Sequence, residues 1–229
     1  MAKILVTAGI LFILISMIIP SCKSSCEGKS SPGLINACYE SEASKGDLEA
    51  QYKLAERFLG ADGIEVDENQ AVKWFKIAAE NGHSDAQRRL GNAYSLGVGG
   101  VPLDVNLAKY WWEKSANAGN IKSQLLLGEH YDKGEILKKD YPKAAYWYLK
   151  AAIAGDHHAQ SIIGSFYSVG RAVPKDPVLA AAWFNLAAKD GDSDYTAERE
   201  NHAKNLSAED LMKARKLADS WQIGENLAY

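Results

Sequence analysis

The chain has 229 residues, of which 47% are hydrophobic and 24% are charged. These fractions are ordinary for a chain that buries a core, and they exclude a disordered or collagen-like protein. A net charge of −3 argues against nucleic acid as a partner, and three cysteines are too few for a disulfide-rich scaffold.

The first 21 residues differ from the rest of the chain. Lys3 is their only charged residue, and an apolar run of 16 residues from Ile4 to Ile19 follows it. A helix of this length spans about 24 Å, which is less than the ~30 Å of a hydrocarbon core. The pattern therefore predicts a secretory signal peptide over residues 1–21, and the alternative is an uncleaved anchor helix.

The residues from Ile19 to Cys22 resemble a bacterial lipobox, in which the cysteine becomes lipidated, although Pro20 departs from that pattern. We expect lipidation at Cys22, and more than one acyl chain would anchor the protein stably in a membrane. Lys23 directly after the cysteine suggests, by analogy, the outer membrane of a Gram-negative cell. Residues 22–33 are small and polar and are predicted to form a tether.

Internal repetition dominates the rest of the sequence. Boundary glycines recur at intervals of 36 or 37 residues, at Gly46, Gly82, Gly119, Gly155 and Gly191. The four units between them share a glutamine column, which consists of Gln51, Gln87, Gln124 and Gln160. They also share a small-residue column of Ala55, Gly91, Gly128 and Gly164, and a tryptophan column of Trp74, Trp111, Trp147 and Trp183. Such agreement indicates one structural unit repeated four times.

Each unit is predicted to contain two helices. In the first unit, Ala50, Leu54 and Phe58 fall on one face of a first helix, and apolar residues from Ala71 to Ala78 fall on one face of a second helix. The predicted N-caps of the second helices are Asp67, Asp104, Asp140 and Asp176. The later first helices are predicted to end at Gly97, Gly134 and Gly170, where the first unit has Ala61. The small-residue column should let the two helices approach closely, with a tryptophan of the second helix beside it.

These periods place the repeats at residues 46–81, 82–118, 119–154 and 155–190. Residues 34–45 align with a second helix alone and are predicted to cap the N-terminal end. Residues 191–229 are predicted to supply capping helices at the other end, because an open stack of repeats needs a cap at each end. We expect about eleven helices in all.

The repeated unit, GxxxAQxxLGxxYxxGxGVxxDxxxAxxWxxxAAxxG, resembles the Sel1-like repeat family, a relative of the tetratricopeptide repeat, over about residues 34–222. The resemblance implies an all-α fold, a right-handed α-solenoid of stacked helix-turn-helix repeats, and an adaptor role. We therefore expect a non-enzymatic scaffold of the bacterial envelope, either an outer-membrane lipoprotein or a periplasmic or secreted protein. Its concave face should bind a protein or peptide partner.

Nothing in the sequence assembles a nucleophile, a base and an oxyanion site, so no cofactor and no metal ion is expected. His157 and His158 are adjacent, and adjacent helical residues point about 100° apart, which does not suit a metal site. Two alternative functions stay open. One is an envelope enzyme acting on peptidoglycan or β-lactams, which would need a cleft with perturbed pKa values. The other is a secreted effector or adhesin that binds a host protein.

The cysteines leave one further choice open. Cys26 and Cys38 could form a disulfide in an oxidising compartment, or Cys38 could stay free in the position that the tryptophans occupy in the repeats.

The solvent side of the first helices follows from the helical period. Core columns lie four, eight and twelve residues after each boundary glycine, so the opposite face lies about six and ten residues after it. The residues at these positions are Tyr52, Glu56, Arg88, Asn92, Leu125, Glu129, Ser161 and Ser165. The resemblance implies that first helices line the inside of the curve, so these residues are predicted to form the partner-binding floor. A plain solvated face is the alternative. Arg88 is the strongest single candidate, because arginine both stacks and forms bidentate bonds at interfaces.

Overall fold

The structure, a computed structural model, describes residues 26–29, 31–60 and 65–227. The predicted signal peptide, the lipidation site Cys22, the start of the tether and Ala61 lie outside the described residues. Within those residues the chain forms eleven α-helices and no strand. None of these helices has both the length and the apolar character needed to cross a membrane.

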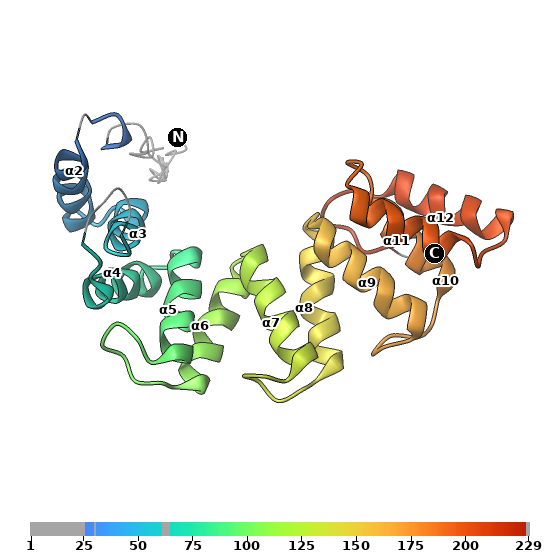
Figure 1. Ribbon diagram of the computed structural model, residues 1–229, viewed down its shortest axis with the longest axis horizontal. Coiled ribbons are helices and arrows are strands. Elements are labelled where there is room, and N and C mark those ends of the chain that lie inside the picture. The colour runs from blue at the N-terminus through green and yellow to red at the C-terminus, as the bar shows by residue number, and fades with distance from the viewer. Residues whose placement is uncertain (1–25, 30, 61–64, 228–229) are drawn as a thin grey trace, which may run out of the picture.

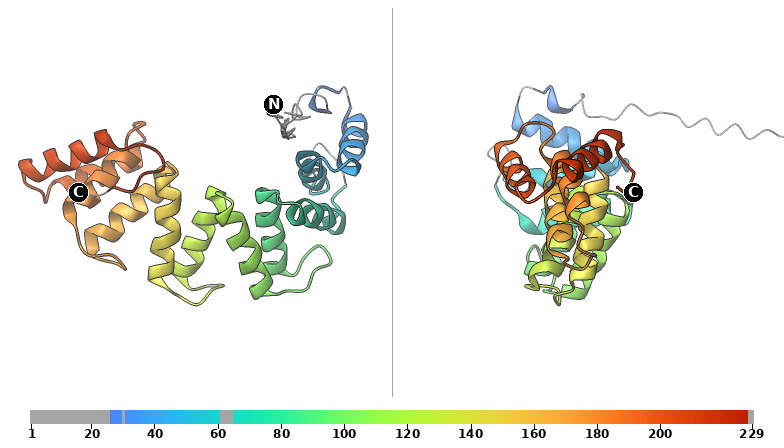
Figure 2. Two further views of the ribbon diagram at one scale, coloured as in Figure 1. Left: turned by 180° about the vertical axis from the view of Figure 1, so that it is seen from behind. Right: turned by 90° about the vertical axis from the view of Figure 1, so that its right-hand side faces the viewer.

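The helices stack as antiparallel pairs along an arc whose two ends rise above its middle (Figure 1). The first helices of the four repeats are α3 (Leu48–Arg57), α5 (Ser84–Leu96), α7 (Ile121–Lys133) and α9 (His157–Val169). The second helices are α4 (Glu68–Glu80), α6 (Val105–Asn117), α8 (Tyr141–Ile153) and α10 (Pro177–Ala187). One helix, α2 (Pro32–Ser44), precedes them, and α11 (Ser193–Ala203) and α12 (Ala208–Ser220) follow. Two further views show the same arc from behind and along its length (Figure 2). The predicted α-solenoid of helix-turn-helix repeats is confirmed.

Local capping explains where each helix begins. The four predicted aspartate N-caps are confirmed, and each carboxylate accepts a backbone N–H at 2.9–3.1 Å. The first helices also have N-caps, which the sequence analysis did not assign, at Asp47, His83, Asn120 and Asp156. The boundary glycines have φ between 80° and 99°, a left-handed conformation that side chains with a Cβ rarely adopt. Capping and turn chemistry therefore set the register of every repeat.

Close contact between the two helices of a repeat depends on the small-residue column. A Cβ at Gly91 would lie 2.5 Å from the ring of Trp112, and a Cβ at Gly128 would lie 2.7 Å from the ring of Tyr148. The space is therefore filled by the aromatic residue that follows each tryptophan of the column, and not by the tryptophan itself as predicted. The column tryptophans pack beside it, and Trp183 is fully buried.

The glutamine column joins each repeat to the one before it. Each buried glutamine side chain reaches back to the last turn of the preceding second helix and donates an Nε2–H to an alanine carbonyl at 3.0–3.2 Å. The donor and acceptor pairs are Gln51 and Ala43, Gln87 and Ala79, Gln124 and Ala116, and Gln160 and Ala152. Because α2 supplies the first of these carbonyls, α2 stands where a second helix would stand. The predicted N-terminal cap thus takes part in the same contact as the repeats.

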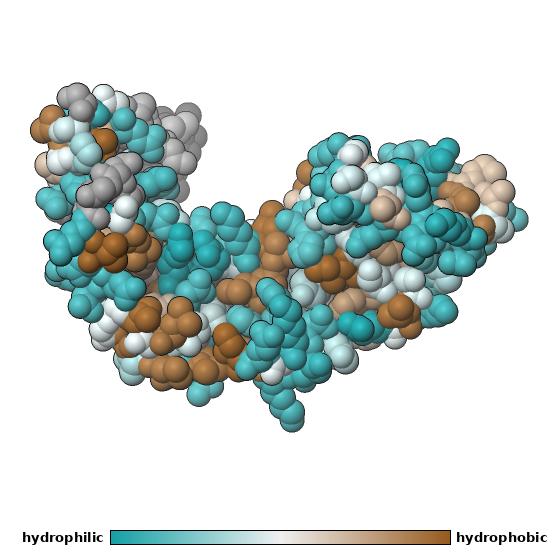
Figure 3. Space-filling model, in the orientation of Figure 1, coloured by the Kyte–Doolittle hydropathy of each residue, from teal (hydrophilic) through white to brown (hydrophobic). Residues whose placement is uncertain are grey.

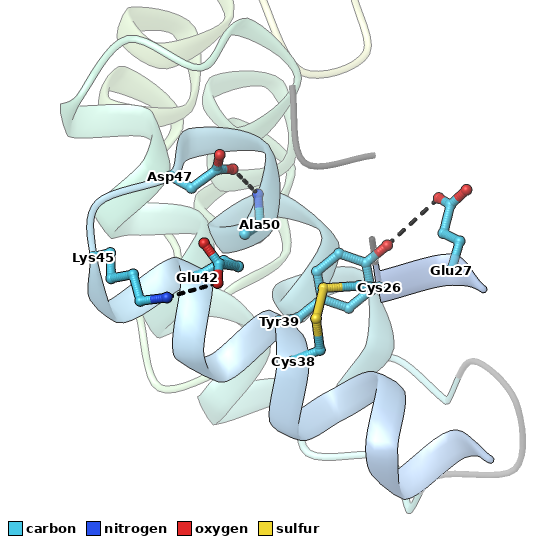
Figure 4. The surroundings of a disulfide bond; sticks show 8 residues. All are labelled: Cys26, Glu27, Cys38, Tyr39, Glu42, Lys45, Asp47 and Ala50. Atoms are coloured by element: carbon cyan, nitrogen blue, oxygen red, sulfur yellow. Dashed lines mark hydrogen bonds and ion pairs between the residues drawn. A yellow bond between two sulfur atoms is a disulfide. The ribbon is translucent and has the colours of Figure 1, made fainter. Parts of the chain in front are cut away.

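A disulfide ties the segment before α2 onto that cap (Figure 4). Cys26 and Cys38 are bonded, which decides between the two alternatives left open by the sequence. Cys26 is fully buried, and next to it Tyr39 donates a hydrogen bond to Glu27 at 3.4 Å. The polar segment predicted as a tether is therefore attached to the folded protein at Cys26.

The C-terminal end of the stack is capped by helices α11 and α12, which do not pack as a further repeat would. Helix α11 buries none of its residues, while α12 packs on α10 through Ala214. The chain then turns back across repeat 4. The backbone N–H of Gly224 donates to the carbonyl of Ile153 at 2.9 Å, and Leu227 is buried.

Candidate functional site

The eight residues predicted to bind a partner lie on α3, α5, α7 and α9. We call the solvent side of these four helices the first-helix face. It is not uniformly open. Glu129 and Ser165 are exposed and Ser161 is buried, while the other five residues are half-buried. Several of them contact other parts of the protein, so each part of the face is described in turn.

At the N-terminal end of the first-helix face, repeats 1 and 2 are joined by a polar and aromatic cluster. Tyr52 stacks on His83 with ring centroids 4.6 Å apart and an interplanar angle of 11°. Glu56 forms an ion pair with Arg89 at 2.7 Å. Burial, followed by the Glu56 carboxylate, raises the pKa of the Tyr52 phenol, so this hydroxyl stays protonated. Arg89, which the sequence analysis did not single out, therefore joins the repeats here.

Arg88, the strongest candidate from the sequence, lies beside this cluster. Its side chain is only 14% exposed and its guanidinium lies 3.5 Å from the carboxylate of Asp85, one turn earlier on the same helix. Asn92, one turn further on, accepts a hydrogen bond from the indole N–H of Trp112 at 2.8 Å. Both side chains thus have partners within repeat 2.

The centre of the first-helix face contains a cavity of about 460 Å³ between α7 and α9. We call it the α7–α9 cavity. Two of the predicted residues, Leu125 and Glu129, line it, and the sequence analysis missed the rest of its lining, which consists of Lys133, Tyr148, His158 and Ile162. Figure 3 shows that the molecule is hollowed between its two ends, with a hydrophobic patch on the floor of the hollow over α7.

Tyr148 is the notable polar group of this cavity. It is 5% exposed, and its ring lies against Gly128. Burial raises the pKa of its phenol, and the negative charges of Asp132 and Glu129 raise it further, so the hydroxyl remains a hydrogen-bond donor at neutral pH. No hydrogen bond to this hydroxyl is found among the described residues.

Tyr148 differs from the aromatic residues at the same position in the other three repeats. In repeat 2 the polar atom of Trp112 is satisfied by Asn92, and in repeats 1 and 4 the equivalent residues, Phe75 and Phe184, have no polar atom. In repeat 3 the residue at the Asn92 position is Glu129, which instead forms an ion pair with Lys133. Repeat 3 therefore places a tyrosine with a protonated hydroxyl in the lining of the cavity. Because Glu129 and Lys133 neutralise each other, the lining of the cavity suits a neutral hydrogen-bond acceptor flanked by apolar groups.

The C-terminal end of the first-helix face is covered. Ser161 is buried and donates a hydrogen bond to Glu198 of α11. Further along α9, His202 of α11 lies 3.3 Å from the Ser168 hydroxyl and also contacts Phe184. The predicted floor therefore remains accessible mainly on α7 and on the facing part of α9. The covering helix could not be inferred from the repeat pattern, because α11 does not follow it.

A further cavity, of about 500 Å³, lies between α10, α11 and α12, and its lining mixes Lys189, Arg199 and Arg215 with Glu200 and Asp219. Across the ranges that the structure describes, no three His, Cys, Asp or Glu side chains lie together in a way that could hold a metal ion.

Comparison with known proteins agrees with the fold. The Sel1 repeat matches residues 48–83, 84–120, 121–156 and 157–192. The solved structure of c5321, a protective antigen present in uropathogenic Escherichia coli strains and displaying an SLR fold, is 32% identical with a TM-score of 0.70. That match covers 86% of this chain and 42% of the antigen. None of the curated proteins matches the chain.

A second solved structure supports the same assignment. A Sel1 repeat protein from Oxalobacter formigenes is 32% identical with a TM-score of 0.67, over 73% of this chain and 48% of that one. The chain thus spans less than half the length of either structure. Because four matched repeats cover more than half of its residues, the protein belongs to the Sel1 repeat family.

Proposed function

We propose that the protein is a non-enzymatic scaffold of the bacterial envelope that binds a protein partner on its first-helix face, centred on the α7–α9 cavity. Sel1 repeat proteins are generally protein-interaction scaffolds, and their fold is typically non-enzymatic. The observation that carries the proposal for this chain is the Tyr148 side chain, which is 5% exposed, lines the cavity and keeps its hydroxyl protonated.

The chemistry of the cavity indicates what it would accept. Leu125 and Ile162 supply apolar walls, and the Glu129–Lys133 pair leaves no net charge. The protonated hydroxyl of Tyr148 can donate a hydrogen bond to a ligand that brings an acceptor. A partner segment that inserts an apolar side chain and offers a backbone carbonyl to Tyr148 would satisfy both requirements.

Two observations support an envelope location. Disulfides persist in oxidising compartments, and the Cys26–Cys38 bond fits export to such a compartment. The similar structure from Escherichia coli is that of a protective antigen, which is consistent with an exported protein. We therefore retain the proposals of a cleaved signal peptide over residues 1–21 and a lipid anchor at Cys22.

Site-specific photo-crosslinking in the native cell would test partner binding. A photoreactive residue at Leu125 or at Ile162 should capture the same partner, whereas one at Lys216 on α12 should not. Tyr148→Phe should reduce that crosslink by about tenfold, because it deletes the hydroxyl and keeps the ring against Gly128. The matched control is Tyr131→Phe, which alters a buried tyrosine of the same repeat outside the cavity lining. Equal crosslinks from Leu125, Ile162 and Lys216 would contradict the proposal, and so would a Tyr148→Phe variant that crosslinks as well as wild type.

Anchoring has a separate test. Labelled palmitate should be incorporated into the wild-type protein and lost in Cys22→Ala, which should then be found in the soluble periplasmic fraction or as an uncleaved precursor. A mature protein that carries no lipid label and begins after residue 24 would rule out the anchor without affecting the partner-binding proposal.

A further inference from the structure

The second helices of the two central repeats carry an exposed aromatic residue at the same position. Tyr110 and Tyr146, each nine residues before a boundary glycine, are 53% and 52% exposed. Each packs edge-on against the next residue, with ring centroids 5.1 Å apart for Tyr110 and Trp111 and 4.9 Å apart for Tyr146 and Trp147. Since neighbouring repeats share their register, the two tyrosines lie on the same side of the solenoid.

A lysine one turn later accompanies each tyrosine. The Nζ of Lys114 lies 4.9 Å from the centroid of Trp111, and the Nζ of Lys150 lies 4.8 Å and 5.2 Å from those of Tyr146 and Trp147. Such contacts hold a cation in place without neutralising it. In the part of the chain that the structure describes, neither lysine forms an ion pair with a carboxylate. We call Tyr110, Lys114, Tyr146 and Lys150 the Tyr–Lys stripe.

The other charges on this side of the helices do not cancel the stripe. Glu113 directly precedes Lys114 in sequence, but it pairs with Lys109 at 3.6 Å. Lys143, one turn before Tyr146, pairs with its own N-cap residue Asp140 at 2.9 Å. These pairs are neutral, so the two lysines of the stripe leave it with a net positive charge.

Repeat 4 shows what covers the equivalent surface. There the positions of the tyrosine and the lysine are occupied by Ala182 and Leu186, both buried. Helix α12 and the segment that follows it lie against α10. Trp221 packs edge-on against Trp183 with ring centroids 6.4 Å apart, and Trp221 and Ile223 line a cavity together with Leu186. The turn that follows α12 therefore places an aromatic side chain beside a tryptophan of the column within this same molecule.

We propose that the Tyr–Lys stripe docks an acidic segment of a partner protein that carries an aromatic residue. The aromatic residue would pack against the tyrosine and tryptophan edges as Trp221 packs against Trp183. Lysines stand in repeats 2 and 3 where repeat 4 has the apolar Leu186, so the external segment must bring carboxylates to match them. This surface lies on the second helices and is separate from the first-helix face.

The test uses the full-length protein and a capped synthetic peptide of alternating glutamate and tryptophan. Binding, followed by fluorescence anisotropy, should weaken as salt rises from about 50 to about 300 mM, because exposed charges are screened. Lys114→Glu combined with Lys150→Glu should weaken binding by about tenfold or more. Lys114→Met combined with Lys150→Met keeps the aliphatic stems over the rings, and it should remove most of the salt dependence without disturbing the fold.

Matched controls separate the stripe from bulk charge. Lys122→Glu combined with Lys216→Glu changes the net charge equally on α7 and α12, and it should leave the affinity within about twofold of wild type. A peptide with lysine in place of glutamate should not bind. The proposal is overturned if the acidic peptide fails to bind, if the lysine peptide binds equally well, or if the two Lys→Glu pairs weaken binding equally.

Discussion

The buried glutamines illustrate how one side chain can fix the position of a whole repeat. Each donates Nε2–H to a carbonyl in the last turn of the preceding helix, and this carbonyl also accepts the backbone N–H of the boundary glycine. Among the described residues, each glutamine Oε1 is buried without a hydrogen-bond partner. The bond gained is therefore partly offset by the acceptor left unpaired. The column contributes more to the alignment of neighbouring repeats than to their free energy of unfolding.

Substitution of Gln124 tests this balance. Gln124→Leu removes the donor to Ala116 and also removes the unpaired oxygen, so the free energy of unfolding should fall by only about 1 kcal/mol. Gln124→Glu should cost more than Gln124→Leu at neutral pH, because it buries a carboxylate against a carbonyl. Urea denaturation measures both, with the exposed Gln222→Leu as a control that should leave stability unchanged. A larger loss for leucine than for glutamate would contradict the assigned donor.

Helix pairing depends on how closely the second aromatic residue of each repeat approaches the first helix. The distance from a Cβ added at the glycine to the nearest ring atom increases from 2.5 Å at Gly91 to 3.1 Å at Gly164. Alanine is favoured over glycine inside a helix by about 1 kcal/mol, while overpacking costs about 1–3 kcal/mol. Helix propensity favours alanine and overpacking disfavours it, so the net effect of a glycine-to-alanine substitution on stability should differ between repeats 2 and 4.

We therefore expect Gly91→Ala to destabilise the protein by about 1–2 kcal/mol and Gly164→Ala to be close to neutral. Thermal and urea unfolding of the two variants, measured side by side, checks this order. Trp112→Phe added to Gly91→Ala should recover part of the loss, because a smaller ring leaves room for the methyl group. Equal effects at the two glycines would show that ring contact does not limit the approach of the helices.

The helices were predictable because their determinants are local. The aspartate N-caps and the apolar faces recur four times and the glycine ends of the first helices three times, and each is set by residues within one or two turns. The first-helix face was predictable as a set of positions but not as a site. Ser161 is covered by α11, and Tyr148 reaches the α7–α9 cavity from the other layer of helices. Contacts between segments so far apart leave no periodic signal in the sequence.

A solenoid has no single central core, and its parts are coupled through neighbours only. The buried apolar residues form three successive clusters along the arc, at the N-terminal cap, at repeats 1 and 2, and from repeat 2 to the C-terminal end. Each cluster is completed by residues of the next repeat. A lesion in the middle should therefore divide the molecule into two parts that unfold separately.

Trp147→Ala should produce that division. Loss of a buried aromatic side chain costs about 3–5 kcal/mol, and Trp147 is 5% exposed at the centre of the largest cluster. Urea unfolding should become biphasic, with hydrogen exchange accelerated in repeats 3 and 4 before repeat 1. The surface substitution Val169→Ala should keep one transition. A single, unshifted transition in Trp147→Ala would refute the packing role of the tryptophan column.

The disulfide at Cys26 determines how far the solenoid could stand from a membrane. Extended chain covers at most about 3.6 Å per residue, so a tether from Cys22 to the start of α2 could reach roughly 36 Å. With Cys26 bonded to Cys38, only the four residues from the proposed lipid anchor to Cys26 can extend, which limits the reach to about 14 Å. An anchored protein would be held by its N-terminal end close to the lipid headgroups. Reduction of the bond would lengthen this reach more than twofold.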